Sequence, residues 1–321
     1  MRNSEFGIRN VFFKPEPGKN ERAMNRQPCH RLTYTFLPLL IALCSLPIFF
    51  PSCSSTPKKP AQILAGRNMA TNQLNLANQT AGQGRYADAL LILDEARRLA
   101  LTTDDPVLRI KTSTSRGSIL FYLGRHDEAF AEWESAAAEG DASGEPVLAA
   151  MARVYAIRAR LVLLGSENPQ GGNAAATAAA QYKTQIAAEM DKVKSDPVSS
   201  AACYVTLGMA EKQLGNWVDA EAAVKKALAI HDKNLYLEEA AYDWFLIASI
   251  RSVAGNYDTA LDALKSAISY DRRAENGFGL ASSWQAMGDV YQKAGRNEEA
   301  ASARRRAADI YRAIGLEINE K

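Results

Sequence analysis

The chain has 321 residues, of which 47% are hydrophobic and 23% are charged, and this balance excludes a wholly disordered protein. The 38 basic and 36 acidic residues leave a net charge of +2, which gives no electrostatic case for nucleic acid as the main partner. Four cysteines and three histidines, scattered along the chain, are too few for a disulfide framework or a metal site.

The first element along the chain is an uncharged apolar run over residues 34–50, with Arg26 and Arg31 just upstream. A basic region followed by a short apolar region is typical of a secretory signal peptide. The alternative is a membrane-spanning helix, but the run is short for a bilayer core and Pro38 and Pro47 interrupt it. We therefore expect a signal peptide over residues 24–53.

The residues before this segment show no periodicity and precede a second methionine, Met24. A signal peptide that starts at Met24 would have an ordinary length. We expect residues 1–23 to be a non-native or unstructured extension, and translation from Met1 remains the alternative.

The apolar run ends in Phe50-Pro51-Ser52-Cys53, and a polar stretch rich in Ser, Pro and Lys follows. This arrangement resembles the lipobox of bacterial lipoproteins, in its relaxed spirochaete-like form with Phe50 and Pro51 in place of the usual residues. The resemblance implies that Cys53 is acylated and anchors the mature chain to a membrane, with residues 54–65 as a flexible tether. An ordinary secretory signal with an incidental cysteine is the alternative.

From residue 66 to the end, glycines recur with separations of 40, 41, 50, 40 and 40 residues, at Gly84, Gly124, Gly165, Gly215, Gly255 and Gly295. Five and twelve residues after five of these glycines stand paired alanines, such as Ala220 and Ala227. A fixed period of about 40 residues indicates a repeat array. A ten-residue insertion near 166–173 would bring Ala180 and Ala187 of the third unit into the same register.

The pattern predicts pairs of antiparallel helices, because a glycine supplies the positive φ of a tight turn and alanines let helices approach closely. A further small position, occupied by Gly117, Gly208 and Gly288, precedes the turn by seven residues. Pro106, Pro146 and Pro197, each behind an acidic residue, are expected to open helices.

The last unit carries Trp284, Met287, Gly288, Tyr291, Gly295, Ala300 and Ala307 in order. This series of large, small, glycine, aromatic and alanine positions resembles the tetratricopeptide repeat. The resemblance implies an all-α fold, a right-handed superhelical solenoid of about six antiparallel helix pairs over residues 66–321. Unrelated helical hairpins with alanine-rich packing are the alternative.

The sequence offers little for catalysis, and we expect no enzyme, no cofactor and no metal. His126 and His231 are interpreted as helix-end residues, and Cys203 as a small buried side chain. The run Arg304-Arg305-Arg306 is expected to form a solvated outer face of the last helix.

The family resemblance implies that the first helix of each pair lines a concave groove that contacts a protein. Its contact positions correspond here to Lys111, Phe121, Tyr155, Met209, Lys212, Tyr242, Phe245 and Asp289. Some of these side chains could instead pack inside the solenoid, so their exposure is left open.

We expect a lipid-anchored scaffold on the periplasmic side of a bacterial envelope that binds another protein through this groove. Similar lipoproteins imply a transporter solute-binding protein or an envelope assembly factor as the partner. The alternative is a carrier in which Tyr155, Tyr242 and Phe245 close around a small apolar ligand or lipid.

Overall fold

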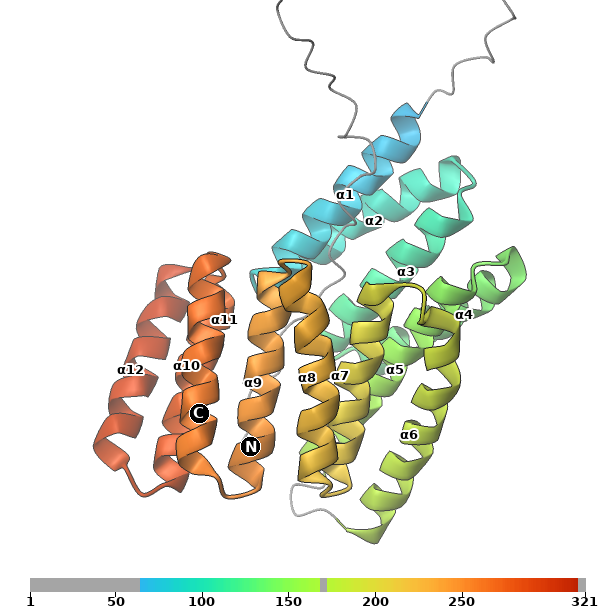
Figure 1. Cartoon of the computed structure of the whole chain (residues 1–321). Helices are drawn as coiled ribbons and strands as arrows, with labels where there is room; N and C mark the ends of the chain where they lie inside the picture. Colours follow the sequence, from blue (N-terminus) through green and yellow to red (C-terminus); the bar gives the residue numbers. More distant parts are fainter. Residues whose placement is uncertain (1–63, 168–171, 317–321) are drawn as a thin grey trace, which may run out of the picture. The chain divides into compact units, whose positions relative to one another are not determined.

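The computed structural model describes residues 64–167 and 172–316, and these residues form α-helices joined by short connections (Figure 1). The helices are α1 (Ala65–Gly82), α2 (Tyr86–Thr102), α3 (Pro106–Tyr122), α4 (His126–Ser143), α5 (Pro146–Glu167), α6 (Asn173–Val193), α7 (Pro197–Gln213), α8 (Trp217–Lys233), α9 (Leu237–Val253), α10 (Tyr257–Arg273), α11 (Gly277–Lys293) and α12 (Asn297–Ala313). Each helix contacts the next one in the chain. The predicted all-α solenoid of six helical hairpins is confirmed.

The extension, the signal peptide, Cys53 and nearly all of the tether lie outside the described residues. Within the described part of the chain, no helix combines the length and the apolar character needed to cross a membrane.

The three predicted Asp/Glu-Pro helix starts are found where the sequence places them. Helices α3, α5 and α7 begin at Pro106, Pro146 and Pro197. The Asp105 carboxylate accepts a hydrogen bond from the Leu108 amide at 3.1 Å, and the Asp196 carboxylate accepts one from the Ser199 amide at 2.9 Å. Each cap satisfies an amide that the first helical turn leaves without a backbone acceptor.

Five of the six expected turn glycines adopt a positive φ, between 75° and 82°, at Gly84, Gly124, Gly215, Gly255 and Gly295. The expectation for Gly165 is wrong, because this residue lies inside α5. There a β-carbon would come within 2.4 Å of the Gln213 side chain of α7, so Gly165 serves close helix packing.

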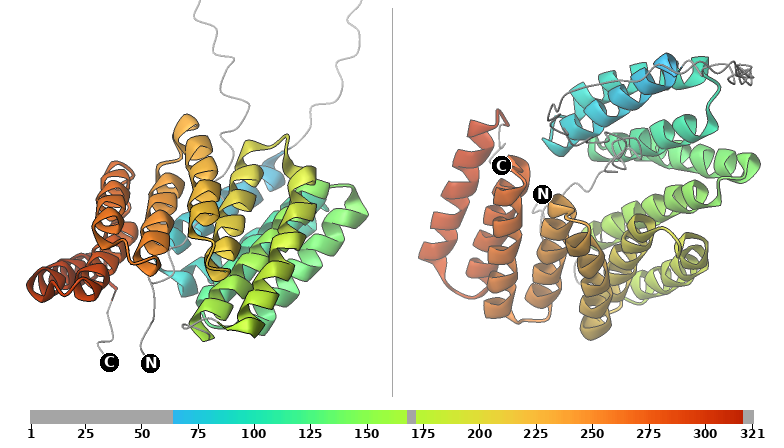
Figure 2. Two further views of the ribbon diagram at one scale, coloured as in Figure 1. Left: turned by 60° about the horizontal axis from the view of Figure 1, so that its bottom comes forward. Right: turned by 45° about the horizontal axis from the view of Figure 1, so that its top comes forward.

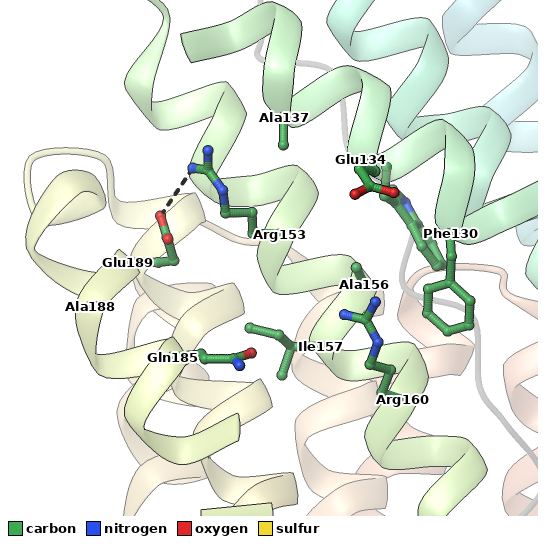
Figure 3. A pocket seen from close by; sticks show the side chains of 11 residues that line it. Phe130, Glu134, Ala137, Arg153, Ala156, Ile157, Arg160, Gln185, Ala188 and Glu189 are labelled. Carbon is green, nitrogen blue, oxygen red and sulfur yellow. Dashed lines mark ion pairs between the residues drawn. The ribbon is translucent and has the colours of Figure 1, made fainter. Parts of the chain in front are cut away.

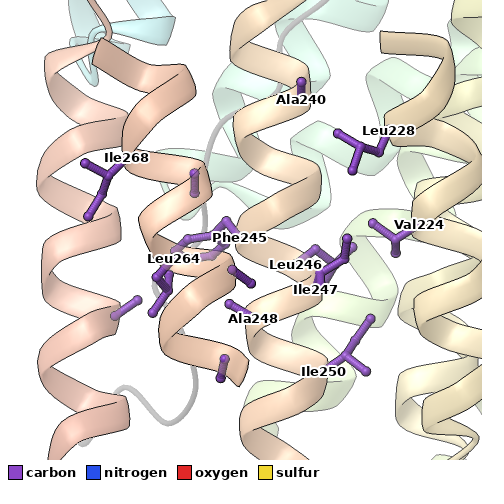
Figure 4. Close-up of a cluster of buried hydrophobic side chains, with 14 of the residues drawn as sticks. Val224, Leu228, Ala240, Phe245, Leu246, Ile247, Ala248, Ile250, Leu264 and Ile268 are labelled. Atoms are coloured by element: carbon purple, nitrogen blue, oxygen red, sulfur yellow. The ribbon is translucent and has the colours of Figure 1, made fainter. Parts of the chain in front are cut away.

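The core is built on the predicted alanine pairs, and Ala220, Ala227, Ala260 and Ala267 are fully buried. Figure 4 shows the larger side chains that pack beside them, including Val224, Ile247 and Leu264 from α8, α9 and α10. At Gly208 a β-carbon would lie 2.5 Å from a Val224 methyl and 3.0 Å from the Ala220 carbonyl oxygen. The small residues therefore set how closely α7 and α8 approach.

The third hairpin departs from the others. Helices α5 and α6 have 22 and 21 residues, whereas the other helices described have 17 or 18. The expectation that Ala180 and Ala187 are packing residues is wrong, since both are exposed, and the buried positions are Ala179 and Ile186. The register of α6 is therefore one residue earlier than a ten-residue insertion implies.

The first hairpin contacts the last one. At Gly84, in the turn between α1 and α2, a β-carbon would lie 2.9 Å from Phe278 of α11 and 2.9 Å from Leu316 beyond α12. The Phe278 ring also packs edge-on against Tyr311, with ring centroids 5.9 Å apart. In the right view of Figure 2 the first hairpin, in blue, lies beside the last hairpin, in orange and red.

Candidate functional site

The candidate binding face is formed by first helices of successive hairpins. Helix α3 contacts α1 and α5, α5 contacts α7, and α9 contacts α11, in addition to the contacts within each hairpin. Residues at equivalent positions of these helices therefore form neighbouring parts of one face.

Three tyrosines and one arginine from α2, α3 and α5 lie together behind this face, and we call them the tyrosine cluster: Tyr86, Tyr122, Tyr155 and Arg158. The Tyr86 and Tyr122 rings are stacked with centroids 5.2 Å apart and planes inclined by 16°. Burial raises the pKa of Tyr122 well above its usual value, and Tyr86 and Tyr242 raise it further while Arg158 lowers it. Tyr122 also packs against the hydrophobic cluster that contains Tyr155 of α5.

Arg158 is held in place from two helices. Its guanidinium carbon lies 5.3 Å from the Tyr155 ring centroid on α5. It donates hydrogen bonds to the Ala202 carbonyl oxygen at 3.0 Å and to the Thr206 hydroxyl at 3.2 Å, both on α7. The arginine therefore joins α5 to α7 within the cluster.

Three of the residues proposed for the groove belong to the core. Phe121 is 6% exposed, Tyr155 9% and Phe245 4%. Phe121 and Tyr155 pack with Trp133 in one hydrophobic cluster, whereas Phe245 packs in another. These rings support the face from behind.

The other five groove residues are half-buried, and three of them come together. The Tyr242 hydroxyl on α9 donates to the Met209 sulfur on α7 at 4.0 Å. The Lys212 ammonium on α7 donates to the Ser249 hydroxyl on α9 at 2.8 Å. Tyr242, Met209 and Lys212 thus form one patch, which we call the α7–α9 patch.

Lys111 and Asp289 lie apart from this patch, on α3 and α11. Asp289 pairs with Arg304 of α12 at 2.9 Å. The same arginine packs on Gly288, where a β-carbon would lie 2.7 Å from Arg304 Cγ. Arg304 is therefore half-buried against α11, while Arg305 and Arg306 are exposed as expected. That the five half-buried residues bind a partner stays a prediction.

A buried ionisable pair between α8 and α9 is not predicted from the sequence. His231 at the end of α8 hydrogen-bonds through Nδ1 to Asp243 of α9 at 2.6 Å, and the two residues are 5% and 0% exposed. Burial raises the pKa of Asp243 to about 6, although the hydrogen bond with His231 opposes this shift. One feature of the sequence could have indicated this pair. Asp243 stands at a repeat position where the neighbouring repeats carry Cys203 and Ser283, so a charged residue replaces a small one there.

Two groups that could take part in catalysis are buried among the described residues. The His231–Asp243 pair is enclosed, and burial raises the pKa of the Cys203 thiol to about 11, which keeps it protonated at neutral pH. Within residues 64–167 and 172–316, no group of three or more His, Cys, Asp or Glu side chains could hold a metal ion.

Residues 281–314 match the model of the tetratricopeptide repeat family, and this segment covers most of α11 and α12. No curated protein is detectably similar in sequence to the chain. Among solved structures, BtubC (BKLC) from P. vanneervenii is 16% identical, with 78% of this chain and 95% of that chain covered and a TM-score of 0.47. MamA is also 16% identical, with 74% and 95% covered and a TM-score of 0.31. Because these likenesses are weak, the solenoid is established by the six hairpins and by the repeat matched in the last of them.

Proposed function

We propose that this tetratricopeptide-repeat array is a scaffold that binds another protein through the face formed by its first helices. The observation that carries the proposal is the α7–α9 patch, in which the half-buried Tyr242 and Met209 contact each other across two first helices. Tyrosine and methionine are enriched at protein interfaces, because they supply large contact areas and, for tyrosine, a hydroxyl that can bond a partner. Lys212 adds a positive charge at the edge of the same patch.

We also propose that the scaffold is held on the periplasmic side of a bacterial membrane by a lipid on Cys53. The apolar run that ends at this cysteine and the polar tether behind it motivate the anchor. An anchored scaffold favours partners of the same compartment, such as a transporter solute-binding protein or an envelope assembly factor.

The burial of the aromatic side chains supports the scaffold over the carrier. A carrier would need Tyr155, Tyr242 and Phe245 to surround a ligand-sized space. Tyr155 and Phe245 instead pack in two different hydrophobic clusters, and the Tyr242 hydroxyl is directed to Met209.

The test is site-specific photo-crosslinking in membranes that contain the full chain. A photoreactive amino acid at position 242 or 209 should form one discrete protein adduct, to be identified by mass spectrometry. Position 270 is the matched control, because Tyr270 is also half-buried but lies on the second helix α10, where its hydroxyl bonds Asp232 at 2.6 Å. The same adduct from all three positions, or none from 242 and 209, would contradict binding through this face.

A further inference from the structure

A pocket of about 360 Å³ opens between α4, α5 and α6, at the irregular third hairpin (Figure 3). It shares no residue with the tyrosine cluster or with the α7–α9 patch. Its size is that of a small-molecule site, at the lower end of the usual range. The pocket therefore needs an explanation separate from the proposed protein partner.

The floor of this pocket is apolar and fixed. Trp133 is 2% exposed, and its indole nitrogen donates a hydrogen bond to the Thr114 carbonyl oxygen at 3.1 Å, which sets the ring orientation. Ile157, Ala156 and Ala137 are buried beside it. Such a floor favours an apolar group of the ligand.

One end of the pocket is closed by an ion pair. Arg153 of α5 reaches Glu189 of α6 at 3.6 Å, and Lys192 reaches the same carboxylate oxygen at 2.9 Å. Arg153 also pairs with Asp141 of α4. The charged side chains at this end therefore form ion pairs with one another, and Figure 3 shows the pair of Arg153 and Glu189.

The other end of the pocket carries two charged side chains, Arg160 and Glu134, that form no ion pair among the described residues. The Arg160 guanidinium lies over the Phe130 ring, 4.7 Å from its centroid, and that contact holds it at the pocket rim. Glu134, one helical turn beyond Phe130, also lines the pocket. In the part of the chain that the structure describes, neither Arg160 nor Glu134 forms an ion pair, whereas most other arginines do.

We propose that this pocket binds a free α-amino acid with an apolar side chain. The planar fork of Arg160 would take the carboxylate, Glu134 the ammonium group, and the side chain would cover Trp133 and Ile157. A simple apolar acid fits less well, because Glu134 would repel it, and a simple amine would face Arg160. A zwitterion satisfies both groups, so the proposal follows from the charge pattern together with the apolar floor.

Calorimetric titration of the full chain with L-phenylalanine and L-leucine tests this proposal. Both should bind, whereas glycine, which lacks the apolar group, should not. N-acetyl-L-phenylalanine, which has no ammonium group, and phenethylamine, which has no carboxylate, should each bind at least about tenfold more weakly. Equal binding of the acetylated compound, or no binding of either amino acid at millimolar concentration, would overturn the proposal.

Two variants locate the site. Arg160→Ala should weaken binding of L-phenylalanine by about tenfold or more, and Glu134→Gln should remove most of the preference over the acetylated compound. Both side chains are exposed, so the melting temperature should not change. Arg306→Ala is the matched control, because Arg306 lies over Trp284 at 4.5 Å on α12, outside the residues that line the pocket. Binding that survives Arg160→Ala unchanged, or falls equally in the control, places the ligand elsewhere and overturns the proposal.

Discussion

Asp243 is fully buried, and the only hydrogen bond that its carboxylate makes among the described residues is with His231. Burial raises the pKa of Asp243 from its ordinary 3.8 to about 6. The folded chain therefore holds this proton more tightly than the unfolded chain does. The contribution of Asp243 to the free energy of unfolding is full below about pH 4 and is lost as the pH rises through about 6.

We predict that Asp243→Asn flattens this dependence. The free energy of unfolding of the wild-type chain, relative to the variant, should fall between about pH 4 and pH 6, as measured by urea denaturation across that range. Asp262→Asn is the control, since Asp262 is exposed and pairs with Lys265. Parallel pH profiles of the wild type and Asp243→Asn would show that the carboxylate is not buried as described.

His231→Ala should lower the free energy of unfolding by about 3 to 5 kcal/mol near neutral pH, because it leaves the buried Asp243 carboxylate without its partner.

The buried alanines of the repeat should not tolerate larger side chains. Ala220→Leu and Ala260→Leu should each destabilise the fold by about 1 to 3 kcal/mol, because the added atoms have no space between closely packed helices. Ala222→Leu is the matched control on the exposed side of α8. Chemical denaturation measures all three, and equal tolerance would refute the packing role of the alanine positions.

Substitutions of two neighbouring aromatic residues on α9 should have different effects, one on the stability of the fold and the other on partner affinity. Phe245→Ala removes a ring that is 4% exposed and should cost about 3 to 5 kcal/mol of folding free energy. Tyr242→Ala removes a half-buried ring at the proposed interface, so its larger effect should be on affinity, about 2 kcal/mol or more. Melting temperatures and partner affinities of both variants decide this. A Tyr242→Ala chain that loses stability but binds normally would remove Tyr242 from the interface.

At the scale of the element, α6 is the helix whose register the sequence pattern misplaced. Alanines stand on several sides of the start of this helix, at Ala176, Ala178, Ala179 and Ala180. The sequence therefore does not determine which side of α6 packs against the neighbouring helices. The structure buries Ala179 and exposes Ala180. The other hairpins lack this ambiguity, because a turn glycine with positive φ fixes where each second helix begins.

We predict opposite outcomes for the two adjacent alanines of α6. Ala179→Leu should destabilise the chain by about 1 to 3 kcal/mol, whereas Ala180→Leu should be within about 0.5 kcal/mol of the wild type. Unfolding midpoints of the two variants are sufficient to test this. If Ala180→Leu is the damaging change, the ten-residue insertion inferred from the sequence is correct.

At the scale of the whole molecule, the repeat period, the proline helix starts and the buried alanine pairs follow from local chemistry, and the sequence predicts them. The tyrosine cluster, the His231–Asp243 pair and the contact of Arg160 with Phe130 each join residues of different helices. Their geometry depends on how the helices are packed, which residue spacing alone does not determine. For this reason the sequence names Tyr155, Tyr242 and Phe245 as candidates but does not establish which of them is core.

The proposed membrane anchor also concerns the whole molecule. Cys53→Ala should leave the chain unprocessed or release it into the soluble fraction, because acyl chains supply most of the membrane affinity. Phase separation in a mild detergent measures this, with Cys44→Ala inside the apolar run as the control. A Cys53→Ala chain that is still cleaved and still enters the detergent phase would exclude a lipoprotein.

The contact of Gly84 with Phe278 and Leu316 limits how this protein can evolve. Open repeat arrays can change length when a hairpin is duplicated or deleted, because each unit contacts only its neighbours. Here an extra or missing hairpin would displace the α1–α2 turn from the start of α11, and the close approach at Gly84 would be lost. We therefore expect the number of hairpins to be kept together with this contact, and sequence variation to take the form of substitutions and of longer helices, as in α5 and α6.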